Sequence, residues 1–170
     1  MKTPDPLREA EEYFHGQIPL TRAMGVRVST DADGAFVVTA PVALNYNHLH
    51  TAFGGSINAV ATLAGYGFLW LQLREDVAHL VIAESSIRFL QPVRETIRAV
   101  CSNPHAQQLA EFHSMLRAEG KAKIALHVRV EEGGEAAAEF RATFVALRDS
   151  VHDSRADASN SGAPDLQPAA

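Results

Sequence analysis

Several segments of the chain alternate apolar and polar residues with a period of two, which is the pattern of a half-buried β-strand. These segments are residues 26–29, 35–42, 79–93, 96–103, 121–132 and 137–148. Asp31, Asp33 and Gly34 form a turn signal between the first two, so we expect a hairpin there. Along 121–130 the apolar side chains share one face and the Lys, His and Arg side chains share the other. One sheet face is therefore expected to be buried and the other wet.

Other segments have the spacing of helices. A helix is predicted over residues 6–15, with acidic side chains early in the segment. Residues 54–73 are apolar nearly all round, as in a helix that is fully buried or spans a membrane. Its few polar side chains, its four glycines and the lack of a basic cluster before it favour a buried central helix. Residues 106–120 end at Gly120, where a left-handed cap would lie, and form either a short covering helix or a long strand extension.

The order of these elements predicts an α+β fold. A hairpin, one long apolar helix and then a run of antiparallel strands describe a curved antiparallel sheet wrapped around a central helix. A single sheet of this kind leaves an open edge and an incomplete core, which association of two copies closes. We therefore expect an oligomer.

Composition indicates one ordinary globular domain. The chain has 170 residues, a formal net charge of −5 and a pI near 5.9. We expect a single domain over residues 1–149 and a disordered tail over 150–170, where Ser, Ala, Asp and Pro dominate. The acidic balance argues against a broad surface for nucleic acid or for an anionic membrane, because both require clustered Lys and Arg.

The single cysteine, Cys101, cannot form an internal disulfide, and one cysteine also excludes zinc fingers. It lies on a predicted strand, where we expect an inert buried thiol. No export signal is visible in the acidic N-terminal segment, and a reducing compartment suits this cysteine usage, so the expected location is the cytoplasm.

Candidate chemistry concentrates in residues 45–55, NYNHLHTAFGG, which lead directly into the central helix. Gly54 and Gly55 at a helix start let a ligand approach the backbone and leave unpaired N–H groups at the positive end of the helix dipole. This arrangement suits the oxyanion of a tetrahedral intermediate, or a phosphate. The alternative is that the two glycines only permit tight packing.

The run APVALNYNHLHTAFGGSINAVATLAGYGFLWLQL and the later VIAESSIRFLQPV resemble the YiiD C-terminal-domain type of thioesterase, within the hotdog-fold acyl-CoA thioesterase superfamily. The resemblance implies a hotdog fold, a homodimer or dimer of dimers, and action on thioesters of coenzyme A or acyl carrier protein, without a cofactor. Asn45 matches the polar residue before the helix loop, and Gly54 and Gly55 match the glycines of a His-Gly-Gly element. Phe53 stands where many relatives have the His, and Thr62 stands where many have a helix acid.

The segment from Gly34 to Leu73 contains no Asp, Glu, Lys or Arg, so the central helix supplies no carboxylate. The candidate bases for activating water are His48 and His50, with Asn45 and Thr62 positioning the water. Glu84 is a further candidate, on a predicted strand face with Arg88; the alternative is that these two side chains simply pair.

The expected contacts to substrate come from Phe53, Gly54, Ser56 and Glu84. Aromatic side chains near the helix line an acyl tunnel or belong to the core; they are Tyr46, Phe53, Tyr66, Phe68 and Trp70. His48-Leu49-His50 could contribute to a metal site, but no third ligand is evident nearby, so no metal is expected. Ser56 is not in a G-x-S-x-G elbow, which argues against a serine hydrolase.

The sequence therefore predicts an acyl-thioester hydrolase that uses direct water attack, with Asn45, His48, Gly55 and Thr62 as its catalytic residues. A non-catalytic module that binds acyl-CoA or another acyl ligand is the alternative, favoured by the missing helix acid. A thioester dehydratase or hydratase is a third possibility, against which the charge-free segment argues, because that chemistry needs a His and an acid close together.

Overall fold

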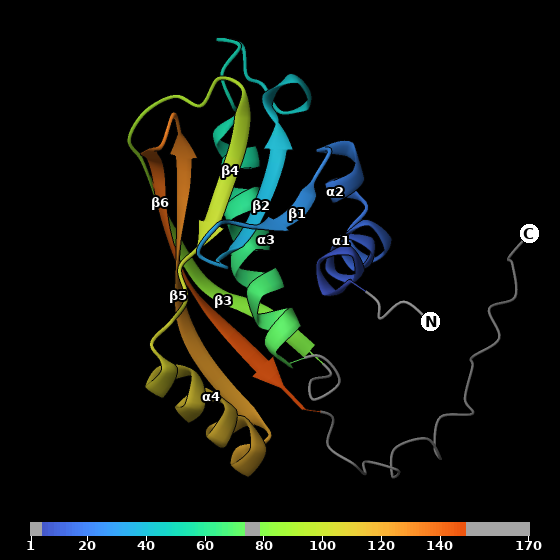
Figure 1. Cartoon of the computed structure of the whole chain (residues 1–170), viewed down its shortest axis with the longest axis vertical. Coiled ribbons are helices and arrows are strands. Elements are labelled where there is room, and N and C mark those ends of the chain that lie inside the picture. Colours follow the sequence, from blue (N-terminus) through green and yellow to red (C-terminus); the bar gives the residue numbers. More distant parts are fainter. Residues whose placement is uncertain (1–4, 74–78, 149–170) are drawn as a thin grey trace, which may run out of the picture.

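The computed structural model describes residues 5–73 and 79–148, so the tail expected over 150–170 lies outside the described residues. Figure 1 shows the elements. In chain order they are α1 (Pro6–Gln17), α2 (Leu20–Ala23), β1 (Arg27–Thr30), β2 (Phe36–Pro41), the 3₁₀ turn η1 (Val42–Leu44), α3 (Gly54–Leu73), β3 (His79–Phe89), β4 (Thr96–Cys101), α4 (Ala106–Glu119), β5 (Lys121–Glu132) and β6 (Glu135–Leu147).

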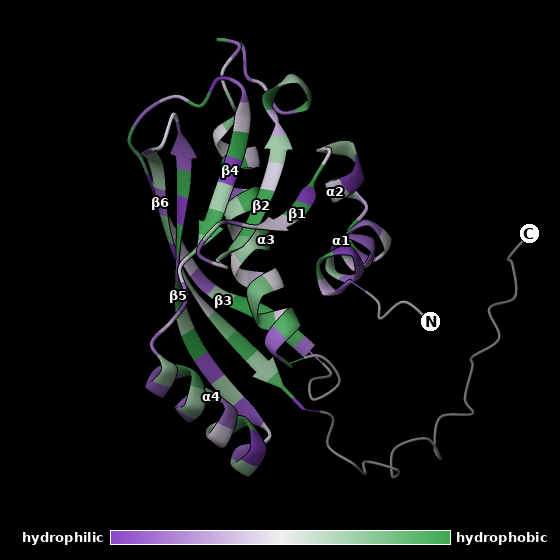
Figure 2. Cartoon of the chain, in the orientation of Figure 1, coloured by the Kyte–Doolittle hydropathy of each residue, from purple (hydrophilic) through white to green (hydrophobic). Residues whose placement is uncertain are grey.

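One antiparallel sheet of six strands, in the order β1-β2-β4-β5-β6-β3, carries the long helix α3 against its inner face (Figure 1). Along β5 every second side chain from Ala122 to Val130 is buried, and the residues between them are exposed. The predicted α+β hotdog arrangement, a sheet wrapped around one central helix, is confirmed. Figure 2 shows α3 mostly in green and white, the colours of hydrophobic and intermediate residues.

Local signals set the element boundaries. The Asp5 side chain accepts a hydrogen bond from the Leu7 amide, and Pro6 occupies the first position of α1. The hairpin turn is held by Asp31 Oδ1, which accepts from the amides of Asp33 and Ala35. Residues 106–119 are the helix α4, ended by Gly120 at φ 70°, so the helical alternative for this segment is the right one.

Two glycines let α3 lie directly on aromatic rings of the core. A Cβ at Gly65 would stand 2.7 Å from Cε2 of Phe144, and a Cβ at Gly67 would stand 2.5 Å from Cε1 of Phe36 and 2.7 Å from Cζ of Phe14. Real Cβ atoms do not approach carbon atoms so closely, so only glycine permits this depth of packing. The position of α3 against the sheet is therefore fixed sterically.

A β-bulge in β3 corrects one expectation about its faces. The pairing with β6 shifts between Ile82 and Glu84, which leaves Ala83 as an extra residue. An extra residue reverses the side-chain alternation, so Ile82 faces α3 whereas Glu84 and Arg88 face the outside of the sheet. The uninterrupted period of two expected over residues 79–93 is therefore wrong, although Glu84 and Arg88 share a face as expected.

β3 ends the sheet and is exposed along most of its length, although it is rich in apolar residues. Val81 is 49% exposed, Ile82 39% and Phe89 52%.

The buried Cys101 lies at the end of β4, as expected, and burial raises the pKa of its thiol to about 12. Within residues 5–73 and 79–148, no helix is long and apolar enough to cross a membrane.

Candidate functional site

A small lobe of residues 45–53 joins η1 to α3. Tyr46 and Ala52 form an isolated antiparallel bridge, which closes the lobe. Inside it, Asn47 Oδ1 accepts from the Leu49 and Thr51 amides at 2.9 and 3.3 Å. The Phe53 amide donates to the Asn45 carbonyl at 2.7 Å, and these bonds together fix the direction in which the chain enters α3.

Both candidate bases lie on the exposed outer part of this lobe. His48 is exposed, and the ring of His50 stacks on Tyr46 with centroids 5.7 Å apart. His50 has φ 58°, an uncommon backbone conformation for a residue other than glycine. The lobe thus presents two imidazoles to solvent beside the entrance to α3.

Asn45 lies buried under the lobe, only 4% exposed. Its Nδ2 donates to the backbone carbonyls of Met24 and Pro41, both at 2.8 Å, so both of its donor protons are used. Only Oδ1 is left to accept a hydrogen bond from a ligand. The side chain ties the lobe to the segment before β1 and to the end of β2.

The start of α3 offers backbone donors. The first helical hydrogen bond runs from the Ile57 amide to the Phe53 carbonyl, at 3.0 Å. The amides of Gly54, Gly55 and Ser56 come before it and have no acceptor among the residues that the structure describes. Gly55 is exposed, so a ligand oxygen can reach these donors at the positive end of the helix dipole.

Two rings flank the glycine pair, so close packing and ligand access occur together here. A Cβ on Gly55 would stand 2.3 Å from Cε1 of Phe53, and a Cβ on Gly54 would stand 3.3 Å from Cζ of Phe89. Phe53 and Phe89 are 55% and 52% exposed. They form an apolar rim beside the glycine pair.

The polar side chains of α3 line its less buried face. Thr62 donates its hydroxyl to the Asn58 carbonyl at 2.9 Å, and Tyr66 one turn later lies 3.3 Å from the Tyr13 hydroxyl. Burial and the Tyr13 hydroxyl raise the pKa of Tyr66. Asn58 was not among the residues assigned a role from the sequence. Its spacing of four residues from Gly54 was the signal that could have identified it.

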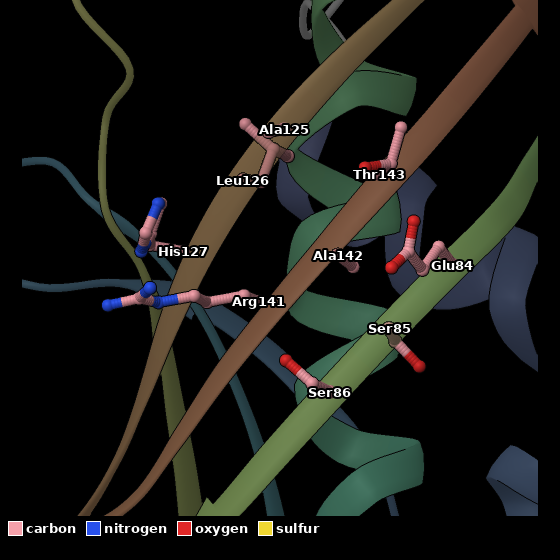
Figure 3. A pocket seen from close by; sticks show the side chains of 9 residues that line it. All are labelled: Glu84, Ser85, Ser86, Ala125, Leu126, His127, Arg141, Ala142 and Thr143. Carbon is pink, nitrogen blue, oxygen red and sulfur yellow. The ribbon is translucent and has the colours of Figure 1, made fainter.

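Glu84 lies apart from these residues. It borders a hollow of about 190 Å³ on the outer sheet face, together with Ser86, His127, Arg141 and Thr143 (Figure 3). Cross-strand pairing places Glu84 beside Thr143, and Ser86 beside Arg141. The alternative that Glu84 pairs with Arg88 is wrong, because Arg88 instead bonds Glu139 at 2.8 Å.

The candidate acyl-tunnel aromatics divide into three groups. Phe68 belongs to the core, whereas Tyr46 and Phe53 are exposed at the lobe. Tyr66 and Trp70 lie under α1, where Trp70 stacks on the ring of Tyr13 with centroids 4.9 Å apart. The structure therefore brings Phe53, Gly54, Gly55 and Ser56 together, with Thr62 farther along the same helix.

The donors at α3 are neutral. Across residues 5–73 and 79–148, the structure contains no group of three or more His, Cys, Asp or Glu side chains that could hold a metal ion. The charge-free segment surrounds the amides on both sides in the chain. The groups nearest to these amides in the chain are backbone dipoles, uncharged side chains and the imidazoles of His48 and His50.

Comparison with known proteins adds a family. The family model described as "Putative thioesterase (yiiD_Cterm)" matches residues 7–148. Among solved structures, a protein from Shewanella oneidensis described as a putative thioesterase is 32% identical, with a TM-score of 0.75; the match covers 84% of this chain and 97% of that one.

A Chlorobaculum tepidum protein of unknown function is 26% identical, with a TM-score of 0.77, over 84% of this chain and 94% of that one. A Bacillus halodurans protein solved with CoA shares the fold at 20% identity and a TM-score of 0.61, over 85% of this chain and 91% of that one. The match spans the whole hotdog domain, including the helix that starts at a glycine pair, so this chain belongs to the family described as "Putative thioesterase (yiiD_Cterm)".

Proposed function

We propose that the protein hydrolyses an acyl thioester of coenzyme A or acyl carrier protein by direct attack of water. Membership of a thioesterase family supports thioester chemistry in general. The observation that carries the proposal is the set of amides at Gly54, Gly55 and Ser56, which have no acceptor in the described chain and lie at the start of an uncharged helix. Such donors stabilise a thioester carbonyl oxygen as it gains negative charge.

The reaction follows from this placement. The carbonyl oxygen accepts hydrogen bonds from the Gly54 and Gly55 amides, and a water oxygen attacks the carbonyl carbon. The tetrahedral intermediate collapses when the carbon–sulfur bond breaks. One water proton passes to the departing sulfur, which gives a free thiol and a carboxylic acid. Removing one donor of this kind costs roughly 100- to 1,000-fold in kcat.

The remaining expected residues have distinct roles in this proposal. His48, exposed on the lobe, accepts the water proton and returns it to the sulfur. Asn45 keeps the lobe in place through Nδ2 and offers Oδ1 to the water. Thr62 and Ser56 present hydroxyl oxygens along α3. Phe53 covers the thioester, and the CoA bound by the Bacillus halodurans protein supports a coenzyme A thioester as substrate.

We further propose that two copies associate through the edge strand β3. An unpaired apolar edge is unfavourable in water, and Ile82 and Phe89 stay exposed on its α3 side. A two-fold axis perpendicular to the sheet keeps every side chain on its own face. Directly opposite residues of an antiparallel pair share a face. The axis must therefore lie midway between one residue and the same residue of the other copy.

Charge selects the register of this pairing. An axis at Ser86 places Glu84 of one copy opposite Arg88 of the other, twice, whereas an axis at Glu84 would oppose two carboxylates. In solution we expect a dimer that Arg88→Glu weakens and that the double variant Glu84→Arg with Arg88→Glu restores. Sedimentation velocity measures this, and a monomeric parent protein would refute the pairing.

A non-catalytic acyl-binding module remains the second candidate, because the segment from Gly34 to Leu73 has no ionisable carboxylate. Thiol release from a panel of short, medium and long acyl-CoAs separates the two functions. If the protein is a hydrolase, the rate of thiol release saturates with the concentration of acyl-CoA for one class of acyl chain length. Saturable binding of acyl-CoA without release of thiol would establish the binding module instead.

A further inference from the structure

The attacking water needs a partner near the amides, and most polar side chains around α3 are already occupied. Both protons of Asn45 Nδ2 go to backbone carbonyls. The Asn47 side chain is used within the lobe. The Thr62 hydroxyl proton is donated to the Asn58 carbonyl.

Asn58 differs from all of these. Its carboxamide is half-buried and makes no hydrogen bond to any residue in the described part of the chain. No buried side-chain polar atom of the described residues lacks a hydrogen-bond partner, so the polar atoms of Asn58 are reached by solvent and its carboxamide is available to a water molecule or a ligand.

Helix geometry directs this carboxamide toward the proposed oxyanion donors. Asn58 follows Gly54 by four residues and Gly55 by three, so the three residues share one face of α3. Side chains on an α-helix lean toward its N-terminus, which brings the carboxamide over the turn that carries the free amides. Neither glycine has a side chain here, and the rings of Phe53 and Phe89, which lie where those side chains would point, flank the approach.

We propose that Asn58 positions the water that attacks the thioester, an inference that rests on the proposed hydrolase function. Oδ1 of Asn58, in place of the buried Asn45 Oδ1, accepts the water proton that His48 does not take, and so aims the water oxygen at the carbonyl carbon held by the Gly54 and Gly55 amides. A carboxamide does not ionise, so Asn58 orients the water and leaves the transfer of the proton to another group. The arrangement replaces the helix carboxylate that this chain lacks.

The test compares Asn58→Leu and Asn58→Asp with the parent protein in thiol release from acyl-CoA. Asn58→Leu removes the acceptor at similar size, and we expect kcat to fall roughly 10- to 100-fold with KM within about twofold. Asn58→Asp keeps the acceptor oxygen and adds a titratable base. We expect the pH profile of its kcat to have one more acidic limb than the parent profile, because kcat falls as the new carboxylate is protonated.

Gln72→Leu is the matched control, because it makes the same change at an exposed position near the other end of α3. A purely structural role for Asn58 would not create a new limb in the pH profile. If the parent hydrolyses thioesters and Asn58→Leu retains its kcat, the role of Asn58 is refuted while the hydrolase stands. If the parent releases no thiol from any acyl-CoA, the proposed function fails and the role of Asn58 fails with it.

Discussion

Replacing Gly67 by alanine tests how closely α3 packs on the core. The added methyl carbon would meet Cε1 of Phe36 at 2.5 Å and Cζ of Phe14 at 2.7 Å, about 1 Å inside the usual carbon–carbon separation. Both rings are buried and come from different elements, so neither can move away into solvent. Overpacking of this kind costs about 1–3 kcal/mol, and the better helix propensity of alanine returns about 1 kcal/mol. We therefore expect a net loss of about 0–2 kcal/mol.

Gly16→Ala is the matched control, because Gly16 also lies in a helix and has no atom within 4 Å of its virtual Cβ. This substitution is expected to stabilise the protein by about 0.5 kcal/mol through helix propensity alone. Urea unfolding followed by circular dichroism measures both free energies of unfolding. If Gly67→Ala is as stable as Gly16→Ala, the close packing of α3 described above is wrong.

Two further predictions concern buried polar groups. Asn45→Ala removes hydrogen bonds to two backbone carbonyls, one buried and one half-buried, and is expected to lower the free energy of unfolding by about 2–3 kcal/mol. A loss below about 0.5 kcal/mol in urea unfolding would show that these two bonds do not hold the lobe. Burial raises the pKa of Cys101 from its ordinary 9.0 to about 12 in the folded protein, so the unfolded thiol ionises first and stability falls as pH rises from about 9 to 12. Cys101→Ala is expected to reduce that alkaline slope by up to about 1.4 kcal/mol per pH unit, and equal slopes in the two proteins would contradict the shift.

The sequence identified the parts of the fold that depend on local patterns. Residues 54–73 were predicted as one buried helix and form α3 with the same bounds, because its apolar surface and the glycine pair at its start are visible in the residue order. The covering helix α4 was only one of two alternatives, because the residue order does not show whether this segment folds back on the adjacent β5 or extends as a strand.

The site could be predicted only in part. The glycine pair marks its position, but the bulge at Ala83 has no clear signal in the sequence, and it moves Glu84 to the opposite face of the sheet. The use of Asn45 Nδ2 by two carbonyls likewise arises from residues distant in sequence, Met24 among them. Contacts between remote segments decide these roles, and spacing along one chain does not encode them.

The most direct test of the central claim compares Gly55→Pro with Gly55→Ala in thiol release from the preferred acyl-CoA. Both variants place a Cβ against Phe53, but only proline removes the amide proton. Proline is tolerated in the first turn of a helix, and Gly54 before it has no Cβ to clash with the ring. Because Cys101 is buried, the protein thiol does not disturb detection of the product thiol. We predict that kcat of Gly55→Pro lies roughly 100-fold or more below that of Gly55→Ala. Equal values in the two variants would contradict an oxyanion hole at the start of α3.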